Sequence, residues 1–317
     1  MTSSDLRIAF AGTPDFAAGH LEHLCRLEFN IVGVFSQPDR PSGRGKATRP
    51  TPVKTVAESH GLPIFQPETL DSSAKDSLIA LAPDVLVVVA FGMILSEEVL
   101  QIPRLGCINV HASLLPRWRG AAPIEHAMLA GDAESGISIM QMNAGLDTGP
   151  VLLAKSTLIT SDDNGESLTE RLMQLGCEGL VEALGDLPAL QETSTDQDDS
   201  RATYASKLSK PDALIDWSQP ALTIQRQVQA FYPRSPAWCP FQGDRLRIIR
   251  ARQVPQQDIH PPGTITEIDK STLSVACGKD ALEVSMLQLP GKKAASIADI
   301  LNGHPELFQQ GSTLQGS

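Results

Sequence analysis

The fold is decided by residues 84–91, which read Asp84-Val85-Leu86-Val87-Val88-Val89-Ala90-Phe91. Almost every side chain in this stretch is aliphatic, as expected of a strand that is buried on both faces of a parallel sheet. Shorter apolar runs predict further strands at 6–11, 31–35, 107–110 and 137–142. Amphipathic stretches separate these runs, and the alternation predicts an α/β doubly wound, Rossmann-like domain over residues 1–190.

The first strand leads into a turn that excludes some enzyme classes. Gly12 opens the turn, Thr13 can cap the helix that follows, and Pro14 suits the first helical position. The glycine fingerprint of dinucleotide-binding domains needs two more glycines here, and they are absent from the sequence. The sequence also lacks a Walker lysine loop, so a nicotinamide- or ATP-dependent enzyme is disfavoured.

The second part of the chain follows a different pattern. Residues 192–201 contain no apolar side chain, so we expect a solvated linker at 191–208. Short strand-like runs, separated by Gly, Pro and Asp, follow at 237–241, 246–250, 263–268, 272–276 and 281–287. Five short strands in about 100 residues predict a small OB-fold-like β-barrel domain over 209–317.

Composition limits the class of protein further. Apolar residues make up 41% and charged residues 20% of the 317 residues, which is typical of a globular chain of about two domains. The longest apolar run, at 85–95, is too short to cross a bilayer, and the start of the chain lacks a secretory pattern. The five cysteines form no Cys-x-x-Cys pair, which indicates a reducing compartment. We expect a cytoplasmic, monomeric protein that does not bind membranes.

The strongest chemical signal is at residues 107–120, which read Cys107-Ile108-Asn109-Val110-His111-Ala112-Ser113-Leu114-Leu115-Pro116-Arg117-Trp118-Arg119-Gly120. The two-residue period of a strand puts Asn109 and His111 on one face, at a carboxyl strand end where α/β sheets bind ligands. An amide donor beside an imidazole suits a reaction that builds negative charge on a carbonyl oxygen and moves a proton. Taken alone, His111 is more simply a core histidine and Asn109 a turn residue.

A second polar segment, at 143–150, reads Asn143-Ala144-Gly145-Leu146-Asp147-Thr148-Gly149-Pro150. We expect it to link two strands at the same sheet edge as His111. Asp147 alone is more simply a turn aspartate, but a carboxylate near His111 would favour the imidazolium form. Together the two segments supply a candidate Asn-His-Asp constellation. We predict no metal site, because His20 and His23 have no further ligands near them in the sequence.

Basic residues gather in the segment 36–54, inside a chain whose net charge is −11. Proline and glycine keep this segment out of regular structure, and its cations could neutralise phosphates or stack on bases. A charge run of this kind is also compatible with an ordinary solvated loop. The same two interpretations, basic surface or internal ion pairing, apply to the second domain at Arg245, Arg247, Arg250 and Arg252.

The motifs at 107–120 and 145–149 together resemble those of the folate-dependent formyltransferases. The Asn-x-His and Leu-Asp-Thr-Gly pieces are shared across that superfamily, which includes the glycinamide ribonucleotide formyltransferases. The stretch 114–120, the basic segment and the second domain are more specific, and they make the chain similar to the methionyl-tRNA formyltransferase family from Arg7 to about Leu301. The resemblance implies 10-formyltetrahydrofolate as formyl donor, initiator methionyl-tRNA as acceptor, and no metal.

The resemblance also implies roles for individual residues. Asn109 and His111 would polarise the formyl oxygen, and Asp147 would orient His111 and help move the amine proton. Contacts to tetrahydrofolate would come from Ser113, Leu114, Leu115 and Pro116, with the apolar pterin loop at Phe91, Gly92, Met93, Ile94 and Leu95. Contacts to tRNA would come from Arg44 first, then Arg40, Lys46 and Arg49, and from Lys207 and Lys210 after the linker.

Two alternatives stay open at this point. A folate-dependent formyltransferase that acts on a small amine, such as an amino sugar or a glycinamide nucleotide, would share the Asn-His-Asp set. That alternative gives no reason for the basic segment and the second domain. A tRNA-binding module with a relic groove would explain the basic features, but the intact Asn109, His111 and Asp147 argue against it.

Overall fold

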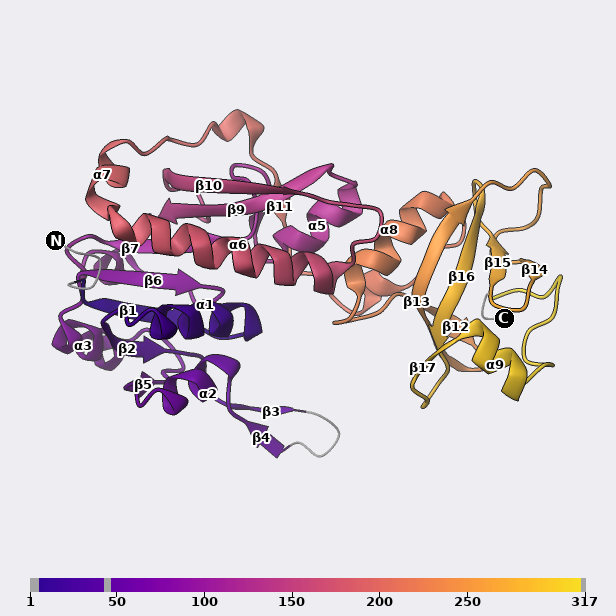
Figure 1. Cartoon of the computed structure of the whole chain (residues 1–317), viewed down its shortest axis with the longest axis horizontal. Coiled ribbons are helices and arrows are strands. Elements are labelled where there is room, and N and C mark those ends of the chain that lie inside the picture. The colour runs from indigo at the N-terminus through magenta and orange to yellow at the C-terminus, as the bar shows by residue number, and fades with distance from the viewer. Residues whose placement is uncertain (1–5, 43–46, 315–317) are drawn as a thin grey trace. The chain divides into compact units, whose positions relative to one another are not determined.

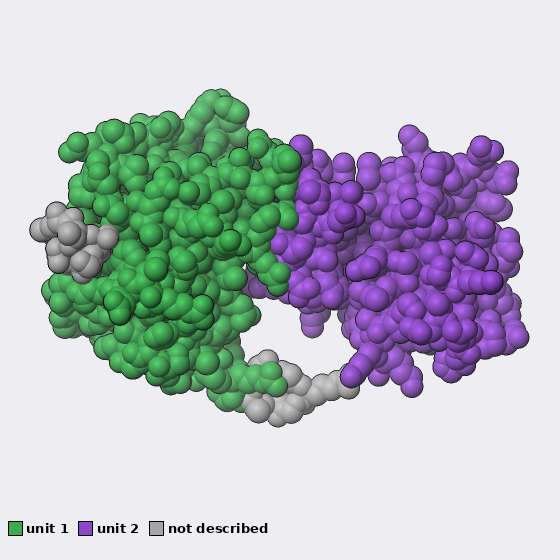
Figure 2. All heavy atoms as spheres, in the orientation of Figure 1, with its two compact units in different colours: residues 1–123, 134–158, 169–205 green, residues 124–133, 159–168, 206–317 purple. Residues whose placement is uncertain are grey.

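The computed structural model describes residues 6–42 and 47–314, and the chain divides into two compact units (Figures 1 and 2). Unit 1 contains residues 1–123, 134–158 and 169–205. Unit 2 contains residues 124–133, 159–168 and 206–317. Two short segments that precede residue 206, 124–133 and 159–168, therefore belong to the second unit.

A seven-stranded sheet forms the centre of unit 1, in the order β10-β9-β7-β6-β1-β2-β5. Its strands are β1 (Ile8–Gly12), β2 (Ile31–Phe35), β5 (Ile64–Phe65), β6 (Val85–Val89), β7 (Cys107–His111), β9 (Glu134–Gln141) and β10 (Val151–Leu158). The strands from β7 to β5 are parallel, whereas β9 is antiparallel to β7 and β10 to β9. The expected Rossmann-like domain is confirmed, with an antiparallel edge that the apolar pattern of residues 137–142 could not reveal.

Helices cover both faces of this sheet, as a doubly wound domain requires (Figure 1). They are α1 (Asp15–Arg26), α2 (Pro52–Ser59), α3 (Ser72–Leu81), α4 (Glu97–Leu100), α6 (Gly165–Gly185) and α7 (Leu187–Glu192). On one face, Leu78 and Val99 pack into an apolar cluster with Cys107 of β7. On the other face, a Cβ on Gly176 of α6 would contact Val110. Successive residues of β7 therefore face opposite sides of the sheet.

Thr13 does not cap the first helix, contrary to expectation. Pro14 occupies the N-cap position of α1, which has no side-chain cap. The Thr13 hydroxyl instead donates a hydrogen bond to the Phe91 carbonyl oxygen, at 3.0 Å. The Thr13 hydroxyl, which the local sequence pattern assigned to the helix end, is therefore bonded to the loop after β6 instead.

Residues 193–205, here called the return segment, lie within the stretch 191–208 that we expected to be a solvated linker, and most of them are exposed. After α7 they pass back along unit 1, where Thr195 bridges to Val151. The short helix η1 (Asp199–Arg201) follows, and β11 (Tyr204–Ala205) then pairs in parallel with β8 (Arg119–Gly120). Residues 193–201 lack apolar side chains, yet backbone and amide groups of the return segment find hydrogen-bond partners in unit 1.

The basic segment forms a short hairpin, although no regular structure was expected there. Strands β3 (Arg40–Ser42) and β4 (Ala47–Arg49) are antiparallel, with Arg40 opposite Arg49. Residues 43–46, between the two strands, lie outside the described part of the chain.

Unit 2 is built on a curled antiparallel sheet in the order β12-β13-β16-β15-β14, with β17 paired to β16. Its strands are β12 (Trp238–Phe241), β13 (Asp244–Val254), β14 (Ile265–Ile268), β15 (Leu273–Ala276), β16 (Ala281–Gln288) and β17 (Ala294–Ser296). Its helices are α5 (Pro123–Ala130), which enters the unit at Ile124, η2 (Pro211–Ala213), α8 (Ala221–Phe231) and α9 (Ile297–Gly303). The five strands expected from the sequence are confirmed, and they form the half-barrel of the predicted OB-like class.

One apolar core holds unit 2 together. Trp217 lies in it, and its indole N–H donates to the Leu314 carbonyl oxygen at 3.0 Å. Ile224 and Val228 of α8 pack into the same core as Leu246 of β13. None of the helices in the described part of the chain is long and apolar enough to cross a membrane.

Candidate active site

Asn109 and His111 lie on one face of β7, near its carboxyl end. Asn109 is 9% exposed and His111 is 5% exposed. Their alternation with Val110, which points to the face covered by α6, follows from the pleat of the strand. In the described structure no protein group forms a hydrogen bond with the Asn109 carboxamide. This amide is therefore available to a ligand.

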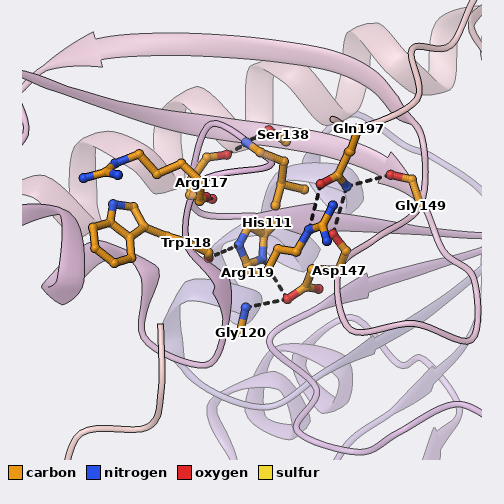
Figure 3. Close-up of polar contacts among 11 residues, drawn as sticks. His111, Arg117, Trp118, Arg119, Gly120, Ser138, Asp147, Gly149 and Gln197 are labelled. Atoms are coloured by element: carbon orange, nitrogen blue, oxygen red, sulfur yellow. Dashed lines mark hydrogen bonds and ion pairs between the residues drawn. The ribbon is translucent and has the colours of Figure 1, made fainter. Parts of the chain in front are cut away.

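The two ring nitrogens of His111 have different surroundings (Figure 3). Nε2 lies 2.9 Å from the Trp118 carbonyl oxygen, and Nδ1 lies 3.7 Å from Asp147 Oδ2. A backbone carbonyl can only accept a hydrogen bond, so the proton on Nε2 is fixed by this contact. Nδ1 is therefore the ring atom that can gain or lose a proton within the site.

Asp147 reaches His111 by a route that differs from the expected one. Because β9 is antiparallel to β7, Gln141 at the end of β9 lies opposite Ile108, near the start of β7. The loop 142–150 thus leaves the sheet at the amino end of β7 and folds back to bring Asp147 to His111. The Asp147 carboxylate also accepts a hydrogen bond from the Gly120 N–H at 2.8 Å.

The backbone of Asp147 has a left-handed conformation, with φ of 52°. Aspartate tolerates this region better than most residues, but it still needs support from its surroundings. Gly149 follows in a tight approach, because a Cβ there would collide with the Gln141 carbonyl oxygen. The carboxylate position therefore depends on what holds this loop.

Gln197 of the return segment supports the loop, and the sequence analysis missed it. Its amide nitrogen donates to the Asp147 carbonyl oxygen at 2.8 Å and to the Gly149 carbonyl oxygen at 2.7 Å (Figure 3). Its amide oxygen accepts from Arg119 Nε at 3.0 Å, and Arg119 is paired with Asp199 at 2.7 Å. A glutamine inside a polar segment has no sequence signal that separates it from a solvated one. Arg119 was quoted in the motif, but without a role.

The turn 113–118 is fixed by hydroxyl groups. Ser113 donates to the Arg117 carbonyl oxygen at 2.6 Å. Ser138 of β9 donates to the Ser113 carbonyl oxygen at 2.8 Å and accepts from the Leu115 N–H at 3.1 Å. The Arg117 guanidinium lies 4.3 Å from the centre of the Trp118 ring. Ser113 is buried and Leu114, Leu115 and Pro116 are half-buried, so this part of the expected folate segment is well ordered.

The loop 91–95, expected to line a pterin pocket, has a buried and an exposed part. Phe91 and Leu95 are buried in the apolar cluster beneath the sheet. Gly92 and Ile94 are exposed and Met93 is half-buried. Gln37 Nε2 lies 3.1 Å from both the Phe91 and the Gly92 carbonyl oxygens. The two buried side chains anchor the loop, and the residues between them are presented at the surface.

The basic residues expected to contact tRNA lie at several places. Arg40 and Arg49 are exposed on the hairpin, whereas Arg44 and Lys46 lie outside the described residues. The cation of Lys54 forms an ion pair with Asp39 at 2.7 Å at the base of the hairpin. A hydrogen bond from the Gln66 amide, followed by that from Lys54, lowers the pKa of the Asp39 carboxyl. Lys54 is therefore partly neutralised.

In unit 2, Lys207 and Lys210 are exposed. The arginines of β13 do not form a uniform basic face. Arg252 is paired with Glu283 at 2.5 Å, and Arg247 donates to Gln288 at 3.2 Å. Internal pairing therefore accounts for part of this row, which leaves Lys207 and Lys210 as the stronger tRNA candidates of the unit. Among residues 6–42 and 47–314, no three His, Cys, Asp or Glu side chains are grouped to hold a metal ion.

Comparison with known proteins bears on both units. Residues 6–184 match the formyl transferase family model, and residues 207–305 match the model of the formyl transferase C-terminal domain. The chain is 50% identical to the methionyl-tRNA formyltransferase of Pseudomonas paraeruginosa, over 98% of this chain and 99% of that one. It is also 50% identical to the methionyl-tRNA formyltransferase of Pseudomonas fluorescens, over 98% of this chain and 97% of the other.

A solved structure shares the fold at much lower identity. It is the N-formyltransferase of Helicobacter canadensis in complex with folinic acid and dTDP-3-aminofucose. The TM-score is 0.64 at 14% identity, and the match covers 88% of this chain and 98% of that one. At this coverage the shared fold extends beyond the seven-stranded sheet of unit 1.

Proposed function

The chain belongs to the methionyl-tRNA formyltransferase family, and we propose that it transfers a formyl group from 10-formyltetrahydrofolate to the amino group of methionine on initiator methionyl-tRNA, for translation initiation. The observation that carries this proposal is the 50% identity to a methionyl-tRNA formyltransferase over 98% of the chain. The enzyme that was solved with an amino sugar nucleotide shares 14% identity, which is a likeness of fold alone. A small amine is therefore the weaker candidate for the acceptor.

The proposed reaction exchanges one carbon–nitrogen bond for another. The methionine amino nitrogen attacks the formyl carbon, and the carbonyl electrons move onto the formyl oxygen. When the tetrahedral intermediate collapses, the bond between the formyl carbon and N10 of the folate breaks. N10 takes up the proton that the amine gives away. The enzyme must therefore stabilise an oxyanion and move a proton across a short distance.

Asn109 and His111 supply these two requirements in our proposal. The Asn109 carboxamide donates to the formyl oxygen as negative charge builds on it. His111 acts through Nδ1, because its Nε2 is held by the Trp118 carbonyl oxygen. Asp147 lies 3.7 Å from Nδ1, where its carboxylate orients the ring and helps to move the amine proton. Such contacts commonly shorten when substrate binds.

The folate would lie between two ordered segments. We assign Ser113, Leu114, Leu115 and Pro116 to one side, since their turn is fixed by the hydroxyls of Ser113 and Ser138. The loop Phe91, Gly92, Met93, Ile94 and Leu95 forms the other side, and its backbone is held by Thr13 and Gln37. Folinic acid in the related N-formyltransferase supports a reduced, formylated folate as the donor class.

The tRNA partner follows from the family, and we assign its contacts to cations of the basic segment and of the start of the second domain. These are the exposed Arg40, Arg49, Lys207 and Lys210, together with Arg44 and Lys46, which lie outside the described residues. We further propose that the enzyme is a cytoplasmic monomer, with residues 1–190 as catalytic domain and 209–317 as tRNA-binding domain. A single mass of about one chain in sedimentation would support the monomer.

Formyl transfer in vitro tests the function. The protein is incubated with 10-formyltetrahydrofolate and either initiator methionyl-tRNA, an amino sugar nucleotide or glycinamide ribonucleotide. We expect transfer to the tRNA. Transfer to an amino sugar alone would favour the small-amine alternative, and no transfer to any acceptor would favour a tRNA-binding module.

Substitutions at β7 test the proposed chemistry. Asn109→Ala and His111→Ala each remove one group from the oxyanion or proton path, and we expect kcat to fall about 100- to 1000-fold. Binding of tRNA, followed by filter retention, stays near the wild-type value. A variant with near wild-type kcat would remove that residue from the mechanism.

A further inference from the structure

The return segment reaches the loop that carries Asp147 through the side chain of Gln197. Both hydrogens of its amide nitrogen are used, one on the Asp147 carbonyl oxygen and one on the Gly149 carbonyl oxygen. Its amide oxygen accepts from Arg119. The reverse orientation of the amide would place an acceptor against two carbonyl oxygens and donors against a guanidinium, so the contacts fix its direction.

Arg119 fixes the orientation of the Gln197 amide by donating a hydrogen bond to its oxygen. Its side chain is only 2% exposed, which is rare for arginine without a strong partner. That partner is Asp199, whose carboxylate lies 2.7 Å from the Arg119 guanidinium and whose side chain is 83% exposed. Arg119 also belongs to β8, whose backbone pairs with β11 of the same return segment. The segment is thus joined to unit 1 by both backbone and side-chain bonds on either side of Gln197.

Within the loop that Gln197 holds, Asn143 Oδ1 accepts hydrogen bonds from the Gly145 N–H at 3.0 Å and from the Thr148 hydroxyl at 2.8 Å. These bonds do not involve Asp147, which is in the left-handed region next to the exposed Leu146. The Asp147 carboxylate accepts a hydrogen bond from the Gly120 N–H at 2.8 Å. Removing the two amide bonds would let the backbone of Asp147 relax toward commoner φ values and carry the carboxylate away from His111 Nδ1.

We propose that Gln197 is a positioning residue for Asp147: its amide bridges two carbonyl oxygens of the loop 142–150 and thereby keeps the carboxylate facing His111. Arg119 and Asp199 act one step further out by fixing the direction of the amide. This inference rests on the proposed function, because the reaction is what reports the position of Asp147. Gln197 does not touch the reacting atoms.

Two variants separate positioning from simple stability. Gln197→Glu has the same shape and keeps an oxygen for Arg119, but it loses both donors and sets a carboxylate against two carbonyl oxygens. Gln197→Ala loses all three bonds. We expect kcat for formyl transfer to fall about 10- to 100-fold in both variants, as misplacement of a catalytic group does. We expect KM for methionyl-tRNA and for 10-formyltetrahydrofolate to stay within about twofold, since no substrate contact is removed.

Gln191 supplies the matched control. It is half-buried like Gln197, and its amide donates to the Leu105 carbonyl oxygen at 2.7 Å and to Gln141 Oε1 at 2.8 Å. Neither of these hydrogen bonds goes to residues 143–149. We expect Gln191→Glu to lower the temperature of unfolding while kcat stays within about twofold of wild type.

The split between kcat and KM is the reading that a purely structural role would not produce. If Gln197 only supported the fold, the loss of kcat in Gln197→Glu would be no larger than in Gln191→Glu at a matched loss of melting temperature, whereas displacement of Asp147 lowers kcat further while KM stays near the wild-type value. A Gln197→Glu enzyme with wild-type kcat, or with a kcat no lower than that of Gln191→Glu, would overturn the proposal. That result needs active wild-type enzyme, whereas a wild type that transfers no formyl group would instead refute the proposed function.

Discussion

The return segment (193–205) and the basic hairpin (40–49) are both polar excursions from unit 1, and they use their polar groups in opposite ways. The return segment turns its groups inward: Gln197 and Thr203 bond to loops around His111, and Asp199 pairs with the buried Arg119. The hairpin pairs its two strands with each other and leaves Arg40 and Arg49 exposed. One segment holds the site together, and the other is available to a partner.

The difference lies in where hydrogen-bond partners are found, not in composition. Among its described residues, the hairpin is tied to the rest of unit 1 at its base, where Asp39 bonds with Lys54 and Gln66. The return segment is bonded along its length, from Thr195 on Val151 to Ala205 on Gly120. A mainly polar segment can therefore be bonded to a catalytic unit along most of its length.

Insertions give the largest expected contrast between the two segments. A Gly-Ser pair between Gln197 and Asp198 separates the amide from the residue that pairs with Arg119. A displacement of about 1 Å at a catalytic group can cost about 100-fold, so we expect kcat to fall by that order. The same pair between Arg44 and Gly45 should leave kcat at saturating tRNA within about twofold. Steady-state kinetics of the two insertions measures this directly.

Equal kcat losses from the two insertions would break the comparison, because the hairpin would then also shape the catalytic groups. Equal retention of kcat would show that the return segment is only a tether. A melting curve of each variant checks that the fold survives.

His20 adds a third case, a polar group enclosed without a full set of partners. It lies in α1, its Nδ1 is 2.7 Å from the Phe16 carbonyl oxygen, and its Nε2 has no partner in the described structure. Burial, partly offset by that hydrogen bond, lowers the pKa of His20 from 6.5 to about 4. Between these values the unfolded chain binds the proton more readily, so the free energy of unfolding falls as pH decreases.

The expected loss is about 2 kcal/mol on going from pH 7 to pH 5. His20→Asn keeps a donor for the Phe16 carbonyl oxygen and removes the titration, so its stability should change less over this range. Urea unfolding of both proteins at several pH values measures the difference. Parallel pH dependences would assign the acid sensitivity to other groups.

Asp199 tests whether a highly exposed residue of the return segment contributes to the free energy of unfolding. Although 83% exposed, it neutralises the buried Arg119 guanidinium. Breaking a buried ion pair costs about 3–5 kcal/mol, but water can reach this one, so we expect Asp199→Ala to lower the free energy of unfolding by about 1–2 kcal/mol. Asp196→Ala, in the same segment, should change it by less than about 0.5 kcal/mol. Denaturant unfolding that ranks Asp196 equal to Asp199 would contradict this.

Arg44 should give the smallest effect. Arg44→Ala removes one cation from the hairpin, and we expect KM for methionyl-tRNA to rise about three- to tenfold with kcat unchanged. The dependence of kcat/KM on salt should also become less steep, because one fewer phosphate contact releases counterions. Arg26→Ala on α1, where the arginine is paired with Glu22, is the control. Unchanged kinetics at every salt concentration would assign tRNA binding elsewhere.

The fold could be predicted from strand patterns because each pattern is local. The run at 84–91 became β6, and the five runs of the second domain became β12 to β16. The direction of β9 could not be predicted, since a buried strand such as Glu134–Gln141 has the same apolar pattern in either direction. The capping role expected of Thr13 was wrong for a similar reason: a long-range acceptor, the Phe91 carbonyl oxygen, competes with the helix end.

The candidate site was predictable to a lesser extent. The period of β7 places Asn109 and His111 on one face. The polar segment 143–150 made Asp147 a candidate partner, and the resemblance to known formyltransferases supplied its role. The meeting of Asp147 with His111 depends on a loop that folds back from the other end of β7, which spacing along the chain does not encode. Gln197 lies 50 residues from Asp147, and a lone amide in a polar stretch has no periodicity to detect.

The attachment of residues 193–205 to unit 1 decides where a chimaera of two family members can be joined. Composition alone would suggest cutting near residue 190, where the chain becomes uniformly polar. A junction there would take Gln197, Asp199 and β11 from the other parent. The loop of Asp147, the buried Arg119 and strand β8 would then each meet a partner from a different protein. Joining the two parents after Ala205 instead takes Gln197, Asp199 and β11 from the same parent as the catalytic domain. The part of the chain that must come from one parent therefore extends beyond α6, the last long helix of that domain.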